Sequence, residues 1–141
     1  MKNILNENLN LRGKKILLRL DLNVPIKNGY ITDTSRIEKV VPTINLLIQK
    51  EAKIIIISHI GRPKGKIIEE LSLKPLSKKL SEFLNKEVIF NKNKIDENIN
   101  KDIKKISNGS VMLLENIRFY DGEEKNDKEF SRQISNLGDI Y

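Results

Sequence analysis

The sequence predicts an α/β fold, a three-layer arrangement in which helices cover both faces of a parallel sheet. Short apolar runs alternate along the chain with segments whose apolar residues recur at helical spacing. One run, residues 53–58 (KIIIIS), contains four consecutive isoleucines and is typical of a strand buried on both faces. Strands separated by helices are joined by right-handed crossovers, which make neighbouring strands parallel.

The first predicted strand covers residues 15–20 (KILLRL), and the segment at residues 21–25 (DLNVP) ends it. The pair Asn28 and Gly29 then predicts a turn. A helix follows, because six apolar residues recur with a period of about 3.6 residues. These residues are Ile37, Val40, Val41, Ile44, Leu47 and Ile48.

The start of this helix has three candidate caps. Ser35 together with Glu38 matches a capping box, and Thr32 and Thr34 remain alternatives. Pro42 lies inside the apolar pattern and removes one backbone donor. We expect a kink at Pro42 rather than the end of the helix.

The remaining elements continue the alternation after the strand at residues 53–58. A second helix is predicted with one apolar face, and this face comprises Leu73, Leu76, Leu80, Phe83 and Leu84. Further strands are predicted at residues 87–90 and 111–115. Between them, residues 91–108 are rich in Lys and Asn. We expect a loop there with a marginal helix, and its apolar residues are Ile95, Ile99 and Ile103.

Glycines are expected to end two of these segments, since glycine readily adopts the left-handed conformation at helix ends. Gly109 closes the segment at residues 91–108. Residues 116–126 are predicted to form a polar loop, and residues 127–137 a helix that Gly138 caps. In this last helix Phe130, Ile134 and Leu137 are expected to face inward.

Residues 139–141 follow that glycine and have the character of the first residues of another strand. Proteins rarely end one step into a core element. We therefore expect the chain to be a truncated piece of a longer protein, with a short C-terminal tail as the alternative.

Composition limits the class of protein. The chain has 141 residues, enough for one domain, and no cysteine, so disulfides and thiolate metal sites are excluded. No apolar run approaches the roughly 20 residues of a membrane span, and the N-terminus lacks a signal-peptide pattern. We expect a cytoplasmic protein without membrane contact.

The formal charge of +7 raises the alternative of a nucleic-acid partner. Most of this charge is lysine, interleaved with Asn and Ile along the whole chain. Such a distribution favours solvated surfaces over a nucleic-acid interface. Arginines are fewer. In a lysine-rich chain, an arginine indicates a position that needs the planar, forked guanidinium group.

Polar residues follow three of the predicted strands. Asp21 and Asn23 follow the first strand, His59 and Arg62 follow the isoleucine strand, and Arg118 follows the fourth, next to Asn116. The carboxyl ends of parallel strands lie at one edge of a sheet, where open α/β sheets bind ligands.

Arg36 is expected at this edge as well, because the first helix begins there. A helix N-terminus carries partial positive charge, so an arginine there indicates a nearby anion. Three guanidinium groups, with Asp21 and Asn23 available for hydroxyl groups, fit a small phosphorylated hydroxy-acid. The glycines of the loop at residues 58–65 would let backbone approach such a ligand.

Simpler interpretations of these residues stay open. Asp21 would only cap a turn, Arg36 would be a surface residue, His59 a satisfied loop residue, and Arg118 would pair with Glu123 or Glu124. A phosphate-binding P-loop at residues 61–67 is disfavoured. Only three residues separate its glycines, Pro63 removes a donor, and Ile67 replaces the hydroxyl residue that meets magnesium. No carboxylate–histidine cluster indicates a metal site.

Four ordered motifs resemble phosphoglycerate kinases over nearly the whole chain. They are RLDLNVP at residues 19–25, ITDTSRIEKVVPTI at 31–44, SHIGRPKG at 58–65 and LLENIRFYDGEEKND at 113–127. The resemblance implies the N-terminal lobe of a two-lobed enzyme. That enzyme transfers a phosphoryl group reversibly between 1,3-bisphosphoglycerate with ADP and 3-phosphoglycerate with ATP. The family is usually monomeric.

The resemblance also implies residue roles. Asp21 and Asn23 would hold the hydroxyl and carboxyl region of the glycerate, and His59, Arg62 and Arg118 would bind its phosphate end. Arg36 would lie nearest the transferred group and stabilise charge in the transition state. The remaining substrate-binding positions implied by these motifs are Leu22, Ile60 and Gly61.

The family's next motif and its whole C-terminal, magnesium-nucleotide-binding lobe are absent from these residues. Residues 1–141 therefore correspond to a partial N-terminal lobe, with Mg-ATP or Mg-ADP expected in the missing lobe. We expect the chain to be inactive as a kinase by itself. A stand-alone domain that binds an anion or nucleic acid is the alternative.

Overall fold

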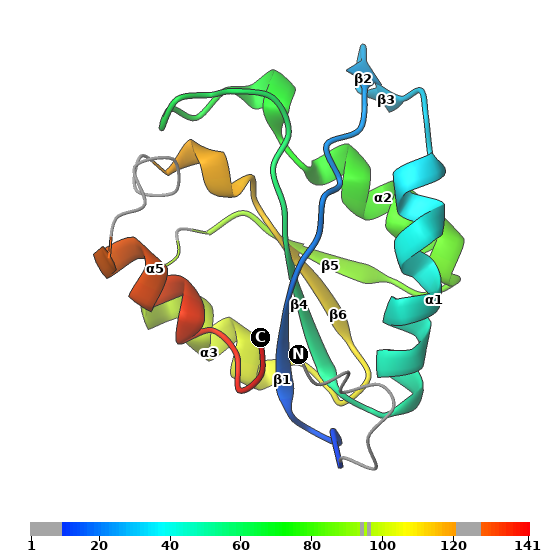
Figure 1. Ribbon diagram of the computed structural model, residues 1–141, viewed down its shortest axis with the longest axis vertical. Helices are drawn as coiled ribbons and strands as arrows, with labels where there is room; N and C mark the ends of the chain where they lie inside the picture. Colours follow the sequence, from blue (N-terminus) through cyan, green and yellow to red (C-terminus); the bar gives the residue numbers. More distant parts are fainter. Residues whose placement is uncertain (1–9, 94, 96, 121–127) are drawn as a thin grey trace.

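The computed structural model describes residues 10–93, 95, 97–120 and 128–141. Within them lies a four-stranded parallel sheet in the order β1-β4-β6-β5 (Figure 1). The strands are β1 (Lys15–Arg19), β4 (Lys53–Ile57), β5 (Val88–Asn91) and β6 (Val111–Leu114). The predicted fold class is confirmed.

Helices cover both faces of this sheet. Helices α1 (Ser35–Gln49) and α2 (Lys74–Leu84) lie on one face, and α3 (Glu97–Lys105) and α5 (Lys128–Ser135) lie on the other (Figure 1). A small hairpin, β2 (Ile26–Lys27) with β3 (Tyr30–Ile31), precedes α1. Two 3₁₀ helices, Glu69–Leu71 and Ile117–Phe119, lie in the loops after β4 and β6.

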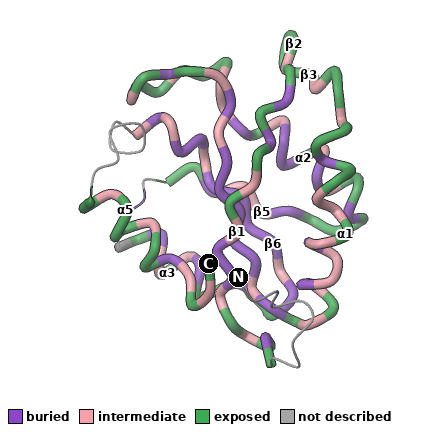
Figure 2. The backbone as a smooth tube through the Cα atoms, in the orientation of Figure 1, coloured by how far each residue is buried: buried purple, intermediate pink, exposed green. Residues whose placement is uncertain are grey.

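The isoleucine strand β4 lies at the centre of both cores (Figure 2). Side chains alternate across a strand, so Ile54 and Ile56 pack with α1 and α2 while Ile55 and Ile57 pack with α3 and α5. All four are fully buried. Each contributes about 1.5–3 kcal/mol of hydrophobic stabilisation.

Helix α1 has the predicted apolar face and runs through Pro42 without a break. The predicted capping box is wrong, because Ser35 already lies in the first turn and the N-cap position belongs to Thr34. The Thr34 side chain makes no capping bond. The Asp33 carboxylate accepts from the backbone N–H of Ser35 at 2.9 Å instead.

Helix α2 buries Leu76, Leu80 and Leu84, but Phe83 is 38% exposed, against the prediction. Ser77 is also buried, which shifts the buried arc of the helix so that Phe83 lies at its margin. Helix α3 confirms the marginal helix expected between residues 91 and 108, with Ile95, Ile99 and Ile103 buried.

The last helix, α5, has Phe130 and Ile134 packed against the second core, which also buries Leu137. The polar loop predicted at residues 116–126 lies outside the described residues from position 121 onward. Its first part forms the 3₁₀ helix Ile117–Phe119, in which Ile117 and Phe119 are buried.

Of the two glycines predicted to end segments, Gly109 is confirmed: it lies four residues beyond the end of α3 and forms the turn into β6, with φ +82°. The predicted capping role of Gly138 is wrong, because Gly138 does not have a positive φ. A Cβ at Gly138 would lie 2.8 Å from Leu17 Cβ, so this glycine lets the chain pass close to β1.

The predicted start of a further strand is confirmed as an isolated parallel bridge between Ile140 and Ile16. The Leu17 N–H donates to the Ile140 carbonyl at 2.8 Å. The chain therefore returns to the side of β1 that is not paired with β4.

Candidate functional site

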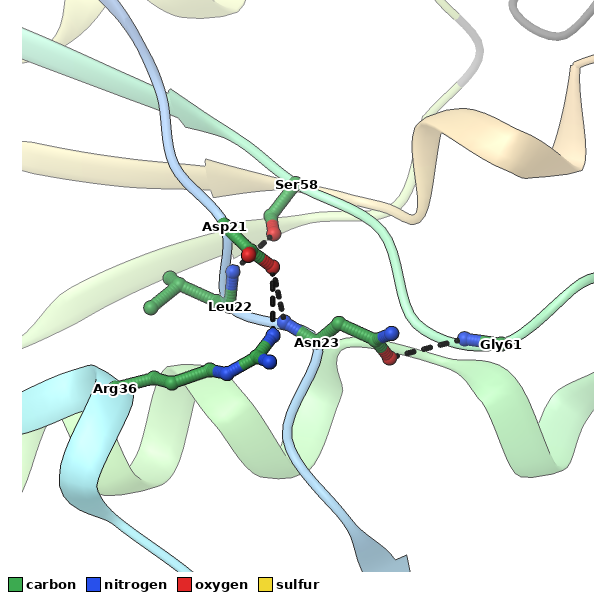
Figure 3. Close-up of polar contacts among 6 residues, drawn as sticks. All are labelled: Asp21, Leu22, Asn23, Arg36, Ser58 and Gly61. Atoms are coloured by element: carbon green, nitrogen blue, oxygen red, sulfur yellow. Dashed lines mark hydrogen bonds and ion pairs between the residues drawn. The ribbon is translucent and has the colours of Figure 1, made fainter.

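Three loops meet at the carboxyl edge of the sheet, in the upper part of Figure 1. They are residues 20–24 after β1, residues 58–65 after β4 and residues 115–119 after β6. The Leu22 N–H donates to Ser58 Oγ at 3.1 Å, and the Gly61 N–H donates to Asn23 Oδ1 at 3.3 Å (Figure 3). The Ile117 N–H donates to the Ser58 carbonyl at 3.1 Å. The predicted convergence of these loops is therefore present.

Arg36 reaches this edge from the first turn of α1. Its guanidinium forms an ion pair with Asp21 at 2.8 Å (Figure 3), and both side chains are substantially exposed. The anion expected near Arg36 is thus supplied by the chain itself. Arg36 also lies near Asp33, whose pKa is lowered mainly by hydrogen bonds from Ser35 and further by the Arg36 charge.

The loop after β4 presents a mixture of exposed cations and buried apolar groups. Arg62 and Lys64 are exposed, and His59 is half-buried. Ile60 and Leu22 are buried in the core beside α1 and α2. Contact between a ligand and either of these two residues would therefore go through backbone atoms.

Gly61 has a structural role that the sequence analysis did not anticipate. Its φ is +66°, and a Cβ at this position would lie 2.8 Å from Leu71 Cδ2. The missing side chain therefore makes room for Leu71. Packing against Leu71 is enough to explain why glycine occupies this position, whether or not a ligand approaches its backbone.

Arg118 lies in the 3₁₀ helix after β6 and is half-buried. Its carbonyl accepts from the Gly65 N–H at 3.1 Å, which joins its loop to the one that carries Arg62. The alternative pairing of Arg118 with Glu123 or Glu124 falls outside the described residues. Arg62 and Arg118 are thus brought to one edge by connected loops, and Arg36 reaches the same edge from the start of α1.

Three polar side chains in this region have structural roles that were not predicted, although Asn116 was noted among the polar residues after the fourth strand. Ser58 and Asn116 are buried, and both hold loops together. Glu115 accepts from Ser72 Oγ at 2.7 Å and from the Leu73 N–H at 2.8 Å, and so binds the start of α2. The sequence feature that could have indicated these roles is a polar residue directly after a buried strand, as at Ser58 and Glu115.

The structure also bears on the P-loop, metal-site and membrane-span alternatives. A P-loop leads straight into a helix, but here the 3₁₀ helix begins at Glu69 and α2 only at Lys74. Among the described residues, three or more His, Asp or Glu side chains are nowhere grouped for metal binding. Over the same residues, every helix is too short or too polar to cross a bilayer.

Comparison with known proteins gives a consistent result. The profile of the phosphoglycerate kinase family matches residues 6–141. The phosphoglycerate kinase of Dictyoglomus turgidum is 49% identical over 131 residues, and that of Clostridioides difficile is 47% identical over 137 residues. These alignments cover 93% and 96% of this chain, and 33% and 34% of the relatives.

Solved structures agree with the sequence matches. The structure of phosphoglycerate kinase from Coxiella burnetii has a TM-score of 0.82 at 40% identity, and covers 94% of this chain. That from Pyrococcus horikoshii has the same TM-score at 31% identity, and covers 95% of this chain. The chain spans about a third of each of these proteins. Together with the three loops at the sheet edge, these matches establish that the chain belongs to the phosphoglycerate kinase family.

Proposed function

We propose that this chain forms the phosphoglycerate-binding part of a phosphoglycerate kinase. The observation that carries the proposal is that Arg36, at the start of α1, lies at the same edge of the sheet as Arg62 and Arg118, whose loops are hydrogen-bonded to each other. Guanidinium groups bind carboxylate and phosphate oxygens in forked pairs. A three-carbon acid with a phosphate at one end offers both kinds of oxygen.

The proposed roles are those that the resemblance of the sequence motifs to phosphoglycerate kinases implies. Arg62 and Arg118, with His59, bind the phosphate end of 3-phosphoglycerate, while Asp21 and Asn23 take the hydroxyl and carboxyl region. Asn23 Oδ1 already accepts from Gly61, so its amide nitrogen is the group left for the substrate. Leu22, Ile60 and Gly61 belong to the same loops and would bind the substrate through their backbone atoms.

Arg36 acts on the reacting group in this proposal. Its ion pair with Asp21 is exposed, and exposed pairs contribute only about 0–1 kcal/mol, so a substrate oxygen can share or replace Asp21 at little cost. When the carboxyl oxygen receives or loses a phosphoryl group, the guanidinium stabilises the developing charge. No general base is required, because such transfer depends on positioning and electrostatics.

Nucleotide binding belongs, in this proposal, to the two-thirds of the relatives' length that this chain does not span. Mg-ATP and Mg-ADP would deliver and accept the phosphoryl group from there. Phosphoryl transfer therefore needs both parts, and the chain alone is expected to bind substrate weakly and not to turn it over.

The test is titration of the 141-residue chain with 3-phosphoglycerate while amide shifts are recorded. Saturable shifts are expected at Arg36 and Arg62. Arg62→Met and Arg118→Met should each weaken binding about 10- to 100-fold, since a hydrogen bond to a charged group contributes roughly 1.5–3 kcal/mol.

Arg12→Met is the matched control, because Arg12 is an exposed arginine paired with Glu51 at the opposite edge of the sheet. It should leave the affinity unchanged. Equal affinity for inorganic sulfate would reduce the site to a general anion site. Shifts confined to the opposite edge, or none at all, would contradict the proposed function.

A further inference from the structure

We infer that Asn116 is a positioning residue whose carboxamide holds the loop of His59 and Arg62 in register with the loop of Arg118. The orientation of the anion-binding groups would then depend on a side chain that does not itself touch the ligand. The consequence for ligand binding rests on the proposed function above, whereas the consequence for loop order does not.

The geometry of Asn116 carries this inference. The residue is 0% exposed. Its Nδ2 donates to the Ile60 carbonyl at 2.9 Å and to the Leu71 carbonyl at 3.0 Å, and its Oδ1 accepts from the Arg118 N–H at 3.0 Å. One side chain thus caps its own 3₁₀ helix through Arg118 and also bonds to two segments far away in the sequence, at Ile60 and Leu71.

The carboxamide is the group that these partners require. Two carbonyl oxygens need two N–H donors, and one backbone N–H needs an acceptor, all within reach of a short side chain. Aspartate has the same shape, but ionised it offers no donor and would face both carbonyls with negative charge. Alanine supplies neither donor nor acceptor.

The backbone of Asn116 is anchored separately from its side chain. Its N–H donates to Glu115 Oε1 at 2.9 Å, and the same carboxylate binds Ser72 and Leu73. Replacing the side chain therefore leaves the end of β6 in place, and the loss falls on the loops after β4 and at Leu71. Ile60 lies two residues before Arg62, so movement of its carbonyl shifts that arginine directly.

The experiment compares amide protection factors in the 141-residue chain with those of Asn116→Ala and Asn116→Asp. Gly61 and Gly65 are the reporters, because their N–H groups bond to Asn23 and to the Arg118 carbonyl. We expect at least tenfold lower protection at both glycines, while the core amides of Ile55 and Met112, which exchange through global unfolding, lose only as much protection as the fall in the free energy of unfolding accounts for. In parallel, the affinity for 3-phosphoglycerate should fall about tenfold or more.

A pH profile separates positioning from a general loss of packing. The carboxyl group introduced by Asn116→Asp would be buried against two carbonyls and next to the Glu115 carboxylate, so its pKa should be raised. The other charged or titratable residues of the loops at residues 58–65 and 115–119 are His59, Arg62, Lys64 and Arg118, and Asn116→Ala controls for them. At low pH the protonated group regains one donor. Protection at Gly61 and Gly65 should therefore recover partly in this variant as pH falls from 8 towards 5, and should not recover in Asn116→Ala.

Asn91→Ala is the matched stability control. Asn91 is also a buried asparagine directly at a strand end, but its side chain bonds to Asp102 and to the Asn93 N–H. It should lower the melting temperature while the protection of Gly61 and Gly65 and the ligand affinity stay as in the unmodified chain.

The outcomes separate the two proposals. Unchanged protection at Gly61 and Gly65 in both Asn116 variants would overturn the positioning role, whatever happens to the ligand. An effect of Asn91→Ala on these glycines equal to that of Asn116→Ala would overturn it too. A third outcome is that the Asn116 variants lose protection at the two glycines although the unmodified chain does not bind 3-phosphoglycerate. This outcome would support the positioning role and reject the proposed function.

Discussion

The two edges of the sheet are held together in different ways. At the amino edge, backbone groups join the loops directly: Gly13 N–H to the Glu51 carbonyl at 3.0 Å and Gly109 N–H to the Ala52 carbonyl at 2.7 Å. At the carboxyl edge, the side chains of Asn23, Ser58, Glu115 and Asn116 add ties between loops.

This difference has a consequence for substitution. Backbone bonds do not depend on the chemistry of a side chain, so the amino edge should tolerate changes of side chain outside its positive-φ glycines, Gly13 and Gly109. The carboxyl edge depends on particular oxygen and nitrogen atoms of side chains, two of which, Ser58 and Asn116, are buried, and losing one of these leaves buried partners unsatisfied. The edge that carries the cationic site is therefore also the edge that is more sensitive to mutation.

Among the substitutions that test this comparison, Glu115→Ala should have the largest effect on the free energy of unfolding. The substitution removes the acceptor for Ser72 Oγ and for the N–H groups of Leu73 and Asn116. We expect the free energy of unfolding to fall by about 2–4 kcal/mol, because each unsatisfied buried group costs about 1–3 kcal/mol. Urea unfolding monitored by circular dichroism measures this change.

Lys53→Ala is the amino-edge counterpart. Lys53 Nζ donates to the Lys104 carbonyl at 3.1 Å in an exposed contact. The free energy of unfolding should change by less than about 0.5 kcal/mol. Equal losses for Glu115→Ala and Lys53→Ala would show that the two edges do not differ in the proposed way.

The next effect compares two glycines, Gly61 at the carboxyl edge and Gly109 at the amino edge. Both have positive φ, and alanine in this conformation costs about 1–2 kcal/mol. At Gly109 the new Cβ would meet the Ile48 carbonyl at an ordinary 3.6 Å, whereas at Gly61 it would clash with Leu71 at 2.8 Å. We expect Gly61→Ala to destabilise by about 1 kcal/mol more, measured by urea unfolding.

Leu71→Ala provides the check on the cause. In that background the clash is gone, so Gly61→Ala and Gly109→Ala should cost the same free energy. A difference that persists without the Leu71 side chain would assign the excess cost to something other than this contact.

A smaller stability effect is expected for the exposed ion pair between Arg36 and Asp21. A double-mutant cycle with Arg36→Met and Asp21→Asn should give a coupling free energy below about 1 kcal/mol, because exposed pairs are screened by solvent. The pair Arg12 with Glu51 at the amino edge should behave alike. Only the variants of Arg36 and Asp21 should weaken binding of 3-phosphoglycerate. A coupling free energy well above 1 kcal/mol between these two residues would show that Arg36 is held too firmly to exchange partners.

The smallest effect concerns pH. Hydrogen bonds from Asn91 and Asn93 lower the pKa of Asp102, which ties the carboxyl end of β5 to α3. A lowered folded-state pKa gives stability that is present above the unfolded value, near 3.8, and is lost as pH falls through the folded pKa. Stability should therefore begin to decline below about pH 4.

Carboxyl titration by nuclear magnetic resonance checks this expectation. In Asn93→Ala the pKa of Asp102 should rise towards its ordinary value, and the acid loss of stability should become shallower. An Asp102 pKa that is the same in both proteins would exclude the Asn93 hydrogen bond as a cause.

Much of the architecture was predictable because it depends on local patterns. The apolar face of α1 and the isoleucines of β4 define their elements by spacing alone. Predictions failed where a neighbour far along the chain decides the outcome. Gly138 was expected to cap a helix, yet it is required by contact with Leu17, and Phe83 is exposed although its spacing fits a buried face.

The candidate site divides in the same way. The alternation of strands and helices in the sequence was sufficient to predict that Asp21, Arg62 and Arg118 lie at one sheet edge. Only the tertiary structure decided that Asp21 pairs with Arg36, that Gly61 accommodates Leu71, and that Asn116 joins the loops. Periodicity records which face of an element is buried. Hydrogen bonds between residues tens of positions apart depend on how the elements pack, and that information is not contained in any one segment of the chain.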